Sequence, residues 1–175
     1  DRRAAANHMH GRFTAFYRKK TQAVEDKFIM FYDISGSQQP YIPICNEIIL
    51  RNKKSLHKQS VYLFSSGIHN VKYRNFQNAA KRGEVFSNWS GYGTNFNCVV
   101  DKIKEKGFQK VIVLSDNEAS LSGEHKGLME EFIESGGYLL FVDTCPGETY
   151  YEGFKNFWTE KVDVEYEKPR KQSKV

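Results

Sequence analysis

Residues 28 to 37 read Phe-Ile-Met-Phe-Tyr-Asp-Ile-Ser-Gly-Ser, an unbroken apolar run that ends in one carboxylate and two hydroxyls. Five large apolar or aromatic residues without polar alternation are typical of a strand buried on both faces, at the centre of a parallel sheet. Asp33 falls where this strand ends, and Ser35 and Ser37 lie in the turn that follows. Because ligands bind at the carboxyl ends of the strands in open α/β sheets, these side chains mark a candidate site.

The side chains of this turn offer only oxygen atoms. A carboxylate and two hydroxyls suit a hard cation such as Mg²⁺ or Mn²⁺. They suit zinc or copper poorly, because no thiolate or imidazole is adjacent. The turn therefore favours magnesium or manganese over a softer metal.

The rest of the chain alternates predicted strands and helices. With the first strand at 27–33, further strands are expected at 60–65, 69–73, 110–114, 138–143 and 162–166, and the one at 69–73 is expected to be an antiparallel edge strand. Helices are expected at 12–24, from Pro40 through Ile49, near 75–81, from Phe96 through Ile103, at 123–135 and around Phe154 to Trp158. This order predicts an α/β fold, a Rossmann-like three-layer sandwich with a mostly parallel central sheet and helices on both faces.

Length and composition narrow the class of protein. A chain of 175 residues is enough for one domain with a substantial core. It has no apolar stretch near the roughly 20 residues that cross a bilayer, so no membrane association is expected. Three cysteines at wide spacings indicate neither a disulfide framework nor a C-x-x-C metal site, and a reducing, cytoplasmic compartment is expected.

The positive charge is concentrated at the two ends. Residues 1–20 carry six basic and one acidic side chain, residues 168–175 carry four basic and none acidic, and residues 21–167 carry sixteen basic and twenty acidic. We therefore divide the chain into a basic, partly helical segment at 1–26, a folded domain at 27–167 and a basic tail at 168–175. Basic ends of this kind contact nucleic acid or another polyanion, or they are solvated termini that aid solubility.

Two further polar loops follow the pattern of the first. Gly91-Tyr92-Gly93-Thr94-Asn95 precedes a predicted helix, and Ser115-Asp116-Asn117-Glu118 follows a predicted buried strand. The set Asp-x-Ser-x-Ser, Thr and Asp, in this order along an α/β chain, resembles the von Willebrand factor A family over roughly residues 27 to 145. That resemblance implies a metal-ion-dependent adhesion site formed by Asp33, Ser35, Ser37, Thr94 and Asp116.

Two branches of the family are most similar. Residues 33–37 with 91–96 resemble intracellular bacterial or phage domains that accompany AAA+ ATPases, and Ser-Asp-Asn-Glu at 115–118 resembles the A domain of Ro-type RNA-binding proteins. The chain departs from the common pattern at Gln38, where many members have an apolar residue, and at Asn117, where many have glycine. The resemblance implies partners such as an AAA+ ATPase or a ribonucleoprotein component.

Such a site would bind its partner by electrostatic attraction. The three hydroxyls are neutral and the two carboxylates supply the negative charge, so a bound cation stays electron-poor and takes a carboxylate from another molecule. The alternative is that Ser35 and Ser37 cap the loop and the next helix, with the carboxylates hydrogen-bonded to backbone amides and no metal present.

Enzymatic readings are less favoured. A dehalogenase-type phosphatase needs a second carboxylate where Ser35 stands, and neither a P-loop nor Gly-x-Ser-x-Gly occurs. The five histidines have no spacing that indicates a catalytic base or a metal pair. Two hypotheses remain: a non-enzymatic, metal-dependent module that binds an acidic residue of a partner protein, and a nucleic-acid-associated scaffold whose basic ends contact the polyanion.

Overall fold

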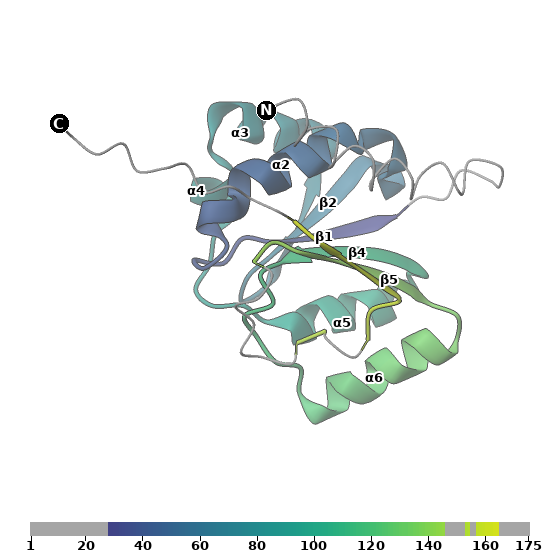
Figure 1. The fold of residues 1–175 in the computed structure, drawn as a ribbon. Coiled ribbons are helices and arrows are strands. Elements are labelled where there is room, and N and C mark those ends of the chain that lie inside the picture. The colour runs from purple at the N-terminus through teal and green to yellow at the C-terminus, as the bar shows by residue number, and fades with distance from the viewer. Residues whose placement is uncertain (1–27, 146–152, 155–156, 165–175) are drawn as a thin grey trace.

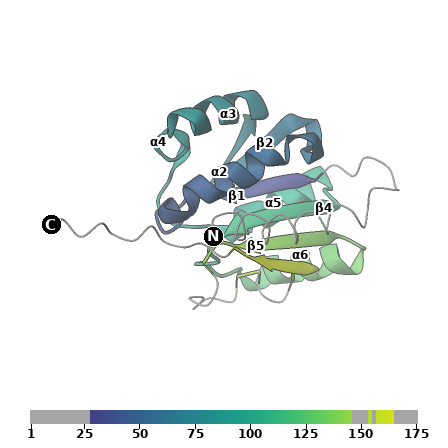
Figure 2. The same ribbon diagram turned by 45° about the horizontal axis from the view of Figure 1, so that its top comes forward.

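The computed structural model of the chain describes residues 28–145, 153–154 and 157–164. These residues form a six-stranded sheet of β1 (Ile29–Asp33), β2 (Ser60–Phe64), β3 (Ile68–Lys72), β4 (Lys110–Ser115), β5 (Tyr138–Asp143) and β6 (Glu160–Asp163). The strands lie in the order β3-β2-β1-β4-β5-β6. The β2–β3 pair is antiparallel and the other four pairs are parallel. Figure 2 shows β2, β1, β4 and β5 following one another across the sheet.

Helices cover both faces of this sheet. Their bounds are α2 (Ile42–Arg51), α3 (Tyr73–Arg82), α4 (Val85–Trp89), α5 (Phe96–Lys106) and α6 (Gly123–Glu134), with short 3-10 turns η1 (Gln39–Tyr41), η2 (Lys53–Ser55) and η3 (His57–Gln59). In Figure 1, α2, α3 and α4 lie above the sheet, and α5 and α6 lie below it. The α/β class, the mostly parallel sheet, its antiparallel edge strand and the helices on both faces are confirmed.

The central strand β1 shows why the sequence gives this arrangement. All five of its residues are buried, as its continuous apolar run predicts. Ile29 and Phe31 join the core cluster under α5 and α6, whereas Met30 and Tyr32 join the cluster under α2 and α3. Alternate side chains of a strand point to opposite faces, so one short segment anchors two separate cores.

Local signals in the sequence set the limits of the helices. The Asn95 side chain accepts a hydrogen bond from the backbone of Asn97 and caps the start of α5 (3.1 Å). Gly107, with φ of 63°, ends the same helix in the left-handed conformation that glycine adopts most readily. Ser122 caps α6 in the same manner as Asn95 caps α5.

Some predicted boundaries are displaced. The edge strand ends at Lys72 rather than Tyr73, because Tyr73 already begins α3 with its ring turned into the core. The helix expected near 75–81 is therefore longer at both ends. The described part of the last predicted helix is a turn in which Phe157 N donates to Phe154 O (2.9 Å). The last strand runs from Glu160 to Asp163 and begins earlier than expected.

Several predictions fall on residues that the structure does not describe. The helix at 12–24, the basic segment at 1–26 and the basic tail at 168–175 lie outside the described residues. Among the helices that are described, none has the length and apolar character needed to cross a membrane.

Candidate metal centre

Three aspartates stand at the carboxyl ends of neighbouring parallel strands, and each makes the same local turn. Asp33 ends β1, Asp116 follows β4 and Asp143 ends β5. In each case one carboxylate oxygen accepts a hydrogen bond from the backbone nitrogen two residues later, at 2.8 Å for Asp33, 3.3 Å for Asp116 and 3.0 Å for Asp143. This turn is a frequent local solution for aspartate, so by itself it indicates only loop geometry.

The second oxygen distinguishes the three carboxylates. Asp33 Oδ2 accepts a hydrogen bond from Ser115 Oγ (2.7 Å), and Asp143 Oδ2 pairs with Lys161 Nζ (2.9 Å). Asp116 Oδ2 is buried and has no hydrogen-bond partner among the described residues. A buried carboxylate oxygen without a partner is costly unless water, a proton or a cation meets it.

Hydroxyl groups lie beside this oxygen-rich edge. The hydroxyls of Ser35 and Ser37 are 3.2 Å apart. Burial raises the pKa of the Asp116 carboxyl, and the neighbouring Ser37 hydroxyl partly offsets this rise. Ser35 is buried whereas Ser37 is partly exposed. The structure therefore brings Asp33, Ser35, Ser37 and Asp116 together, with Ser37 on the side that solvent reaches.

Burial dominates the electrostatics of the two acidic groups. It raises the pKa of Asp33 to about 7, against hydrogen bonds from Ser115 and Ser35 that lower it, and the nearby charge of Asp116 raises it further. Burial also raises the pKa of Asp116. No basic side chain of the described residues pairs with either carboxylate, whereas Lys161 neutralises Asp143. A cation bound between Asp33 and Asp116 would relieve both desolvation and mutual repulsion.

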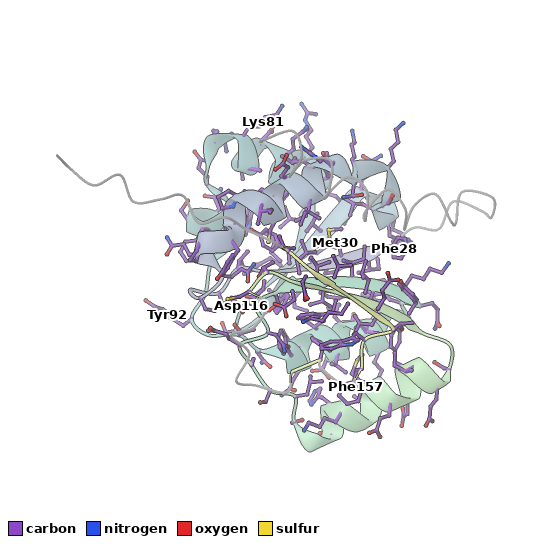
Figure 3. All side chains as sticks on the ribbon, in the orientation of Figure 1. Phe28, Met30, Lys81, Tyr92, Asp116 and Phe157 are labelled. Atoms are coloured by element: carbon purple, nitrogen blue, oxygen red, sulfur yellow. The ribbon has the colours of Figure 1, made fainter. Side chains whose placement is uncertain are left out.

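For the fifth predicted residue, Thr94, the structure gives the position of its loop but no contact with the other four residues. Its loop is held to the end of β2, because Asn95 N donates to Ser65 O (2.8 Å) and Gly91 packs so tightly that an added Cβ would lie 2.3 Å from Ser65 Oγ. Across the described residues, no hydrogen bond joins Thr94 to the other four. Figure 3 shows Asp116 and Tyr92, which belongs to the Thr94 loop, toward the same side of the molecule.

The chemistry of the donor set agrees with a hard cation. The described residues include no group of three or more His, Cys, Asp or Glu that could hold a metal ion. The cluster instead combines two carboxylates with hydroxyls, and such all-oxygen sets suit Mg²⁺ or Mn²⁺. A cation bound here would contact Asp116 Oδ2, the buried oxygen that has no hydrogen-bond partner among the described residues. The residues of the cluster therefore fit a bound Mg²⁺ or Mn²⁺.

The sequence did not predict the contacts by which Ser115, Gln38 and Thr144 support the cluster. Ser115 Oγ of β4 donates a hydrogen bond to Asp33 Oδ2 of β1, and no local sequence pattern predicts that contact. Gln38 is fully buried; it accepts from Thr144 Oγ1 (3.0 Å) and its amide nitrogen lies 3.3 Å from Cys45 Sγ. Gln38, a departure from the family pattern, therefore ties the first loop to the end of β5.

The second departure, Asn117, has a structural role as well. Its backbone is left-handed, with φ of 61°, a conformation that asparagine tolerates better than most residues. Its Oδ1 accepts a hydrogen bond from Phe154 N (3.3 Å), and the side chain is buried. The asparagine therefore supplies the turn that glycine supplies in related patterns, and it also holds the segment that leads to β6.

A separate polar cluster joins α5 to α6. Ser122 Oγ lies 2.6 Å from His125 Nδ1, and His125 Nε2 lies 3.0 Å from Asp101 Oδ1. The set contains the residue types of a hydrolytic triad, but Asp101 is 65% exposed, whereas a triad aspartate is buried. Because Ser122 Oγ also accepts from His125 N (3.3 Å), the cluster acts as a helix cap.

No protein-family model and no curated protein matches the sequence. Among solved structures, the fold is similar to proximal thread matrix protein 1 (PTMP1) from the mussel byssus, in a structure whose MIDAS motif is occupied by zinc. The identity is 13%, the TM-score is 0.47, and the match covers 79% of this chain and 43% of that protein. A likeness this distant does not extend that protein's metal site to the present chain.

Proposed function

We propose that this chain is a non-enzymatic interaction module that binds Mg²⁺ or Mn²⁺ at Asp33, Ser35, Ser37, Thr94 and Asp116, and through the metal an acidic residue of a partner protein. The observation that carries the proposal is the buried, unpartnered Asp116 Oδ2 beside the Ser35 and Ser37 hydroxyls. The resemblance to the von Willebrand factor A pattern agrees with it. The proposal places the partner at the carboxyl ends of β1 and β4.

The chemistry of the proposed site follows from its charges. A bound divalent cation supplies a Lewis-acidic centre that attracts an incoming carboxylate. Asp33 and Asp116 hold the cation, and the neutral hydroxyls of Ser35 and Ser37 leave part of its charge uncompensated. The protein's own contribution is to hold these groups on loops fixed by Ser115 and Gln38.

The proposed site also favours binding over catalysis. Asp33 accepts hydrogen bonds from Ser35 N and Ser115 Oγ, so both of its oxygens are engaged. A catalytic carboxylate works together with a neighbouring acid or base. Among the described residues, no histidine or lysine pairs with Asp33 or Asp116, which supports a binding role.

The test is metal-dependent unfolding of the whole chain. Free Mg²⁺ or Mn²⁺ at about 100 times its Kd is expected to raise the unfolding free energy by roughly 2.7 kcal/mol relative to EDTA. Asp116→Asn keeps the size of the side chain and removes its charge, so it is expected to abolish this increment, as is Asp33→Ala. The matched control is Asp101→Asn, which removes an exposed carboxylate from α5 and should retain the full increment.

The partner's carboxylate is tested by water relaxation. Mn²⁺ on the wild type is expected to show high proton relaxivity that falls when acetate or a glutamate-containing peptide is added, since a carboxylate displaces bound water. The glutamine version of the peptide should leave the relaxivity unchanged. If neither metal shifts the unfolding of the wild type, Asp116 Oδ2 is satisfied by water or a proton and the loop-capping interpretation holds.

A further inference from the structure

One stretch of the folded domain contains no acidic residue. Residues 48–83 include no Asp or Glu, although an even spread of the 21 acidic residues over 175 positions would put about four there. The same stretch carries eight basic side chains: Arg51, Lys53, Lys54, Lys58, Lys72, Arg74, Lys81 and Arg82. The nearest acidic residues on either side, Glu47 and Glu84, pair with Arg51 and Arg82. Of the cations between them, Lys53, Lys58, Lys72, Arg74 and Lys81 form no ion pair with the described residues.

The fold gathers these side chains at one edge of the sheet. Lys53 of η2 lies over the ring of Tyr73, with its Nζ 5.2 Å from the ring centroid. The Tyr73 hydroxyl also donates to Leu50 O (3.1 Å), so the end of α2 and the start of α3 are held together. Lys72 and Arg74 flank Tyr73 and are exposed. Lys53 therefore lies at the start of α3, the helix that carries Arg74.

Two more cations, Lys58 and Lys72, lie at the same end of the sheet. Val71 packs under α2 and α3, so the next side chain of β3, Lys72, points to the opposite face of the sheet. Lys72 lies opposite Ser60 in the β2–β3 pair, and Ser60 Oγ donates to Lys58 O (3.4 Å). Lys58 is exposed, and β3 is the outermost strand on this side of the sheet. Lys53, Lys58, Lys72 and Arg74 form no ion pair with any described residue. Their mutual repulsion is accordingly not offset within the part of the fold that the structure describes.

The outer face of α3 continues the same surface. Tyr73, Phe76 and Ala79 point into the core. The exposed residues Arg74, Asn78 and Lys81 recur at four- and three-residue spacing and so share one face. Figure 3 shows Lys81 at the top of the molecule, far from Phe157 on the opposite side of the sheet. We define the basic face as Lys53, Arg74, Asn78 and Lys81.

We propose that the basic face binds double-stranded DNA, with α3 lying along the duplex and its cations on the backbone phosphates. Lysine and arginine at this density are the electrostatic footprint of phosphate binding. An α-helix with exposed arginine and asparagine fits the wide major groove of B-form DNA, whereas the deep, narrow groove of A-form RNA excludes it.

The composition of the basic face argues against other polyanions. Tyr92 is the one exposed large hydrophobic residue in the described part of the chain, and it lies on the Thr94 loop rather than on this face. Single-stranded nucleic acid is bound by aromatic stacking, and membrane-surface helices insert apolar side chains. Protein interfaces are depleted of lysine and enriched in aromatic residues. A lysine-rich face without aromatics fits a duplex backbone better than any of these.

The rest of the domain has the opposite charge. Residues 84–167 carry sixteen acidic and seven basic side chains. Since DNA is repelled by that part of the fold, the charge distribution orients the duplex onto the α3 edge. None of the residues of the basic face belongs to the proposed metal site, so DNA binding should persist in EDTA. The two proposals can therefore fail independently.

The experiment is fluorescence anisotropy of a short labelled DNA duplex with the full chain in EDTA, over about 50 to 200 mM salt. The test variant is Lys53→Gln with Arg74→Gln and Lys81→Gln. The matched control removes three charges from α5 instead, through Lys102→Gln, Lys104→Gln and Lys106→Gln. The basic termini are present in every protein, so their contribution cancels in the comparison.

The test variant is expected to bind the duplex at least tenfold more weakly than the control. The slope of its log K against log salt should become shallower by about 0.9 for each phosphate that the variant no longer neutralises. A charge-preserving variant, Lys53→Arg with Arg74→Lys and Lys81→Arg, should bind like the wild type, which separates the removal of charge from misfolding. Equal affinities of test variant and control would overturn the proposal.

Three competing ligands complete the test. The same duplex sequence as RNA, the single DNA strand, and vesicles that contain phosphatidylserine are each expected to bind more weakly than duplex DNA. Tighter binding of RNA or of the single strand would overturn the assignment to duplex DNA. Tighter binding of the vesicles, abolished in the test variant, would assign the basic face to a membrane surface instead.

Discussion

Asn117 gives a sharp test of how the loop after β4 is held. Its Oδ1 accepts from Phe154 N, and its backbone φ is 61°. Asn117→Ala leaves a buried N–H without its acceptor, at about 1–3 kcal/mol. It also places alanine in a left-handed conformation that costs about 1 kcal/mol more. We therefore expect Asn117→Ala to lower the unfolding free energy by about 2–4 kcal/mol.

A glycine variant separates the two contributions. Asn117→Gly removes the same hydrogen bond but adopts positive φ without steric penalty, so it should be more stable than Asn117→Ala by about 1 kcal/mol. The matched control is Asn97→Ala, which removes an amide that accepts from Ser122 N (3.0 Å) at a half-buried position of α5. We expect this control to change stability by less than about 1 kcal/mol, because alanine favours the helix.

The assay is urea unfolding followed by tryptophan fluorescence. Trp158 packs against Phe141, with ring centroids 5.7 Å apart, and so reports on the core that the Asn117 contact anchors. A double-mutant cycle between Gly153 and Asn117 gives a second test, because a Cβ at position 153 would lie 2.0 Å from Asn117 Oδ1. Gly153→Ala should therefore cost less in the Asn117→Gly background than in the wild type. Equal stability of the alanine and glycine variants at 117, or additivity in the cycle, would refute this reasoning.

Three further substitutions follow from local geometry. Gly127→Ala, inside α6 with open space around it, should raise the unfolding free energy by about 0.5–1 kcal/mol in the same assay. Gly137→Ala should lower it by about 1–3 kcal/mol, since its Cβ would lie 2.5 Å from the Phe132 carbonyl oxygen; an unchanged midpoint would contradict this. Ser122→Ala should lower it by about 1 kcal/mol and fray the start of α6 in hydrogen exchange, and protection equal to the wild type at His125 would argue against the cap.

The strands of the sheet could be predicted from the apolar character of their own residues. β1 and β4 are continuous apolar runs that must be buried on both faces, and their order with the helices selects a parallel sheet. The limit between β3 and α3 was misplaced by one residue because no loop separates them. Lys72 is the last strand residue and also the cap of the helix, and no glycine or proline marks the change.

The candidate site was predicted only in part, for a related reason. The spacing of Asp33, Ser35 and Ser37 predicts that they lie together, because all three belong to one turn. The contacts of Ser115 with Asp33 and of Thr144 with Gln38 join residues far apart in sequence. Such pairs depend on the register between strands, which a single sequence does not reveal. The unpartnered state of Asp116 Oδ2 is likewise a property of the packed edge.

The central position of β1 has a consequence for how the chain folds. Ile29 lies opposite Val111 of β4, so the sheet is not closed on that side until a distant segment arrives. A fragment that ended before β4 would present the apolar edge of β1 to solvent, ready to pair with another chain. Long-range pairing of this kind makes folding slow. We therefore expect aggregation of nascent or refolding chains to begin at β1, and chaperones that shield this edge to improve the yield of folded protein.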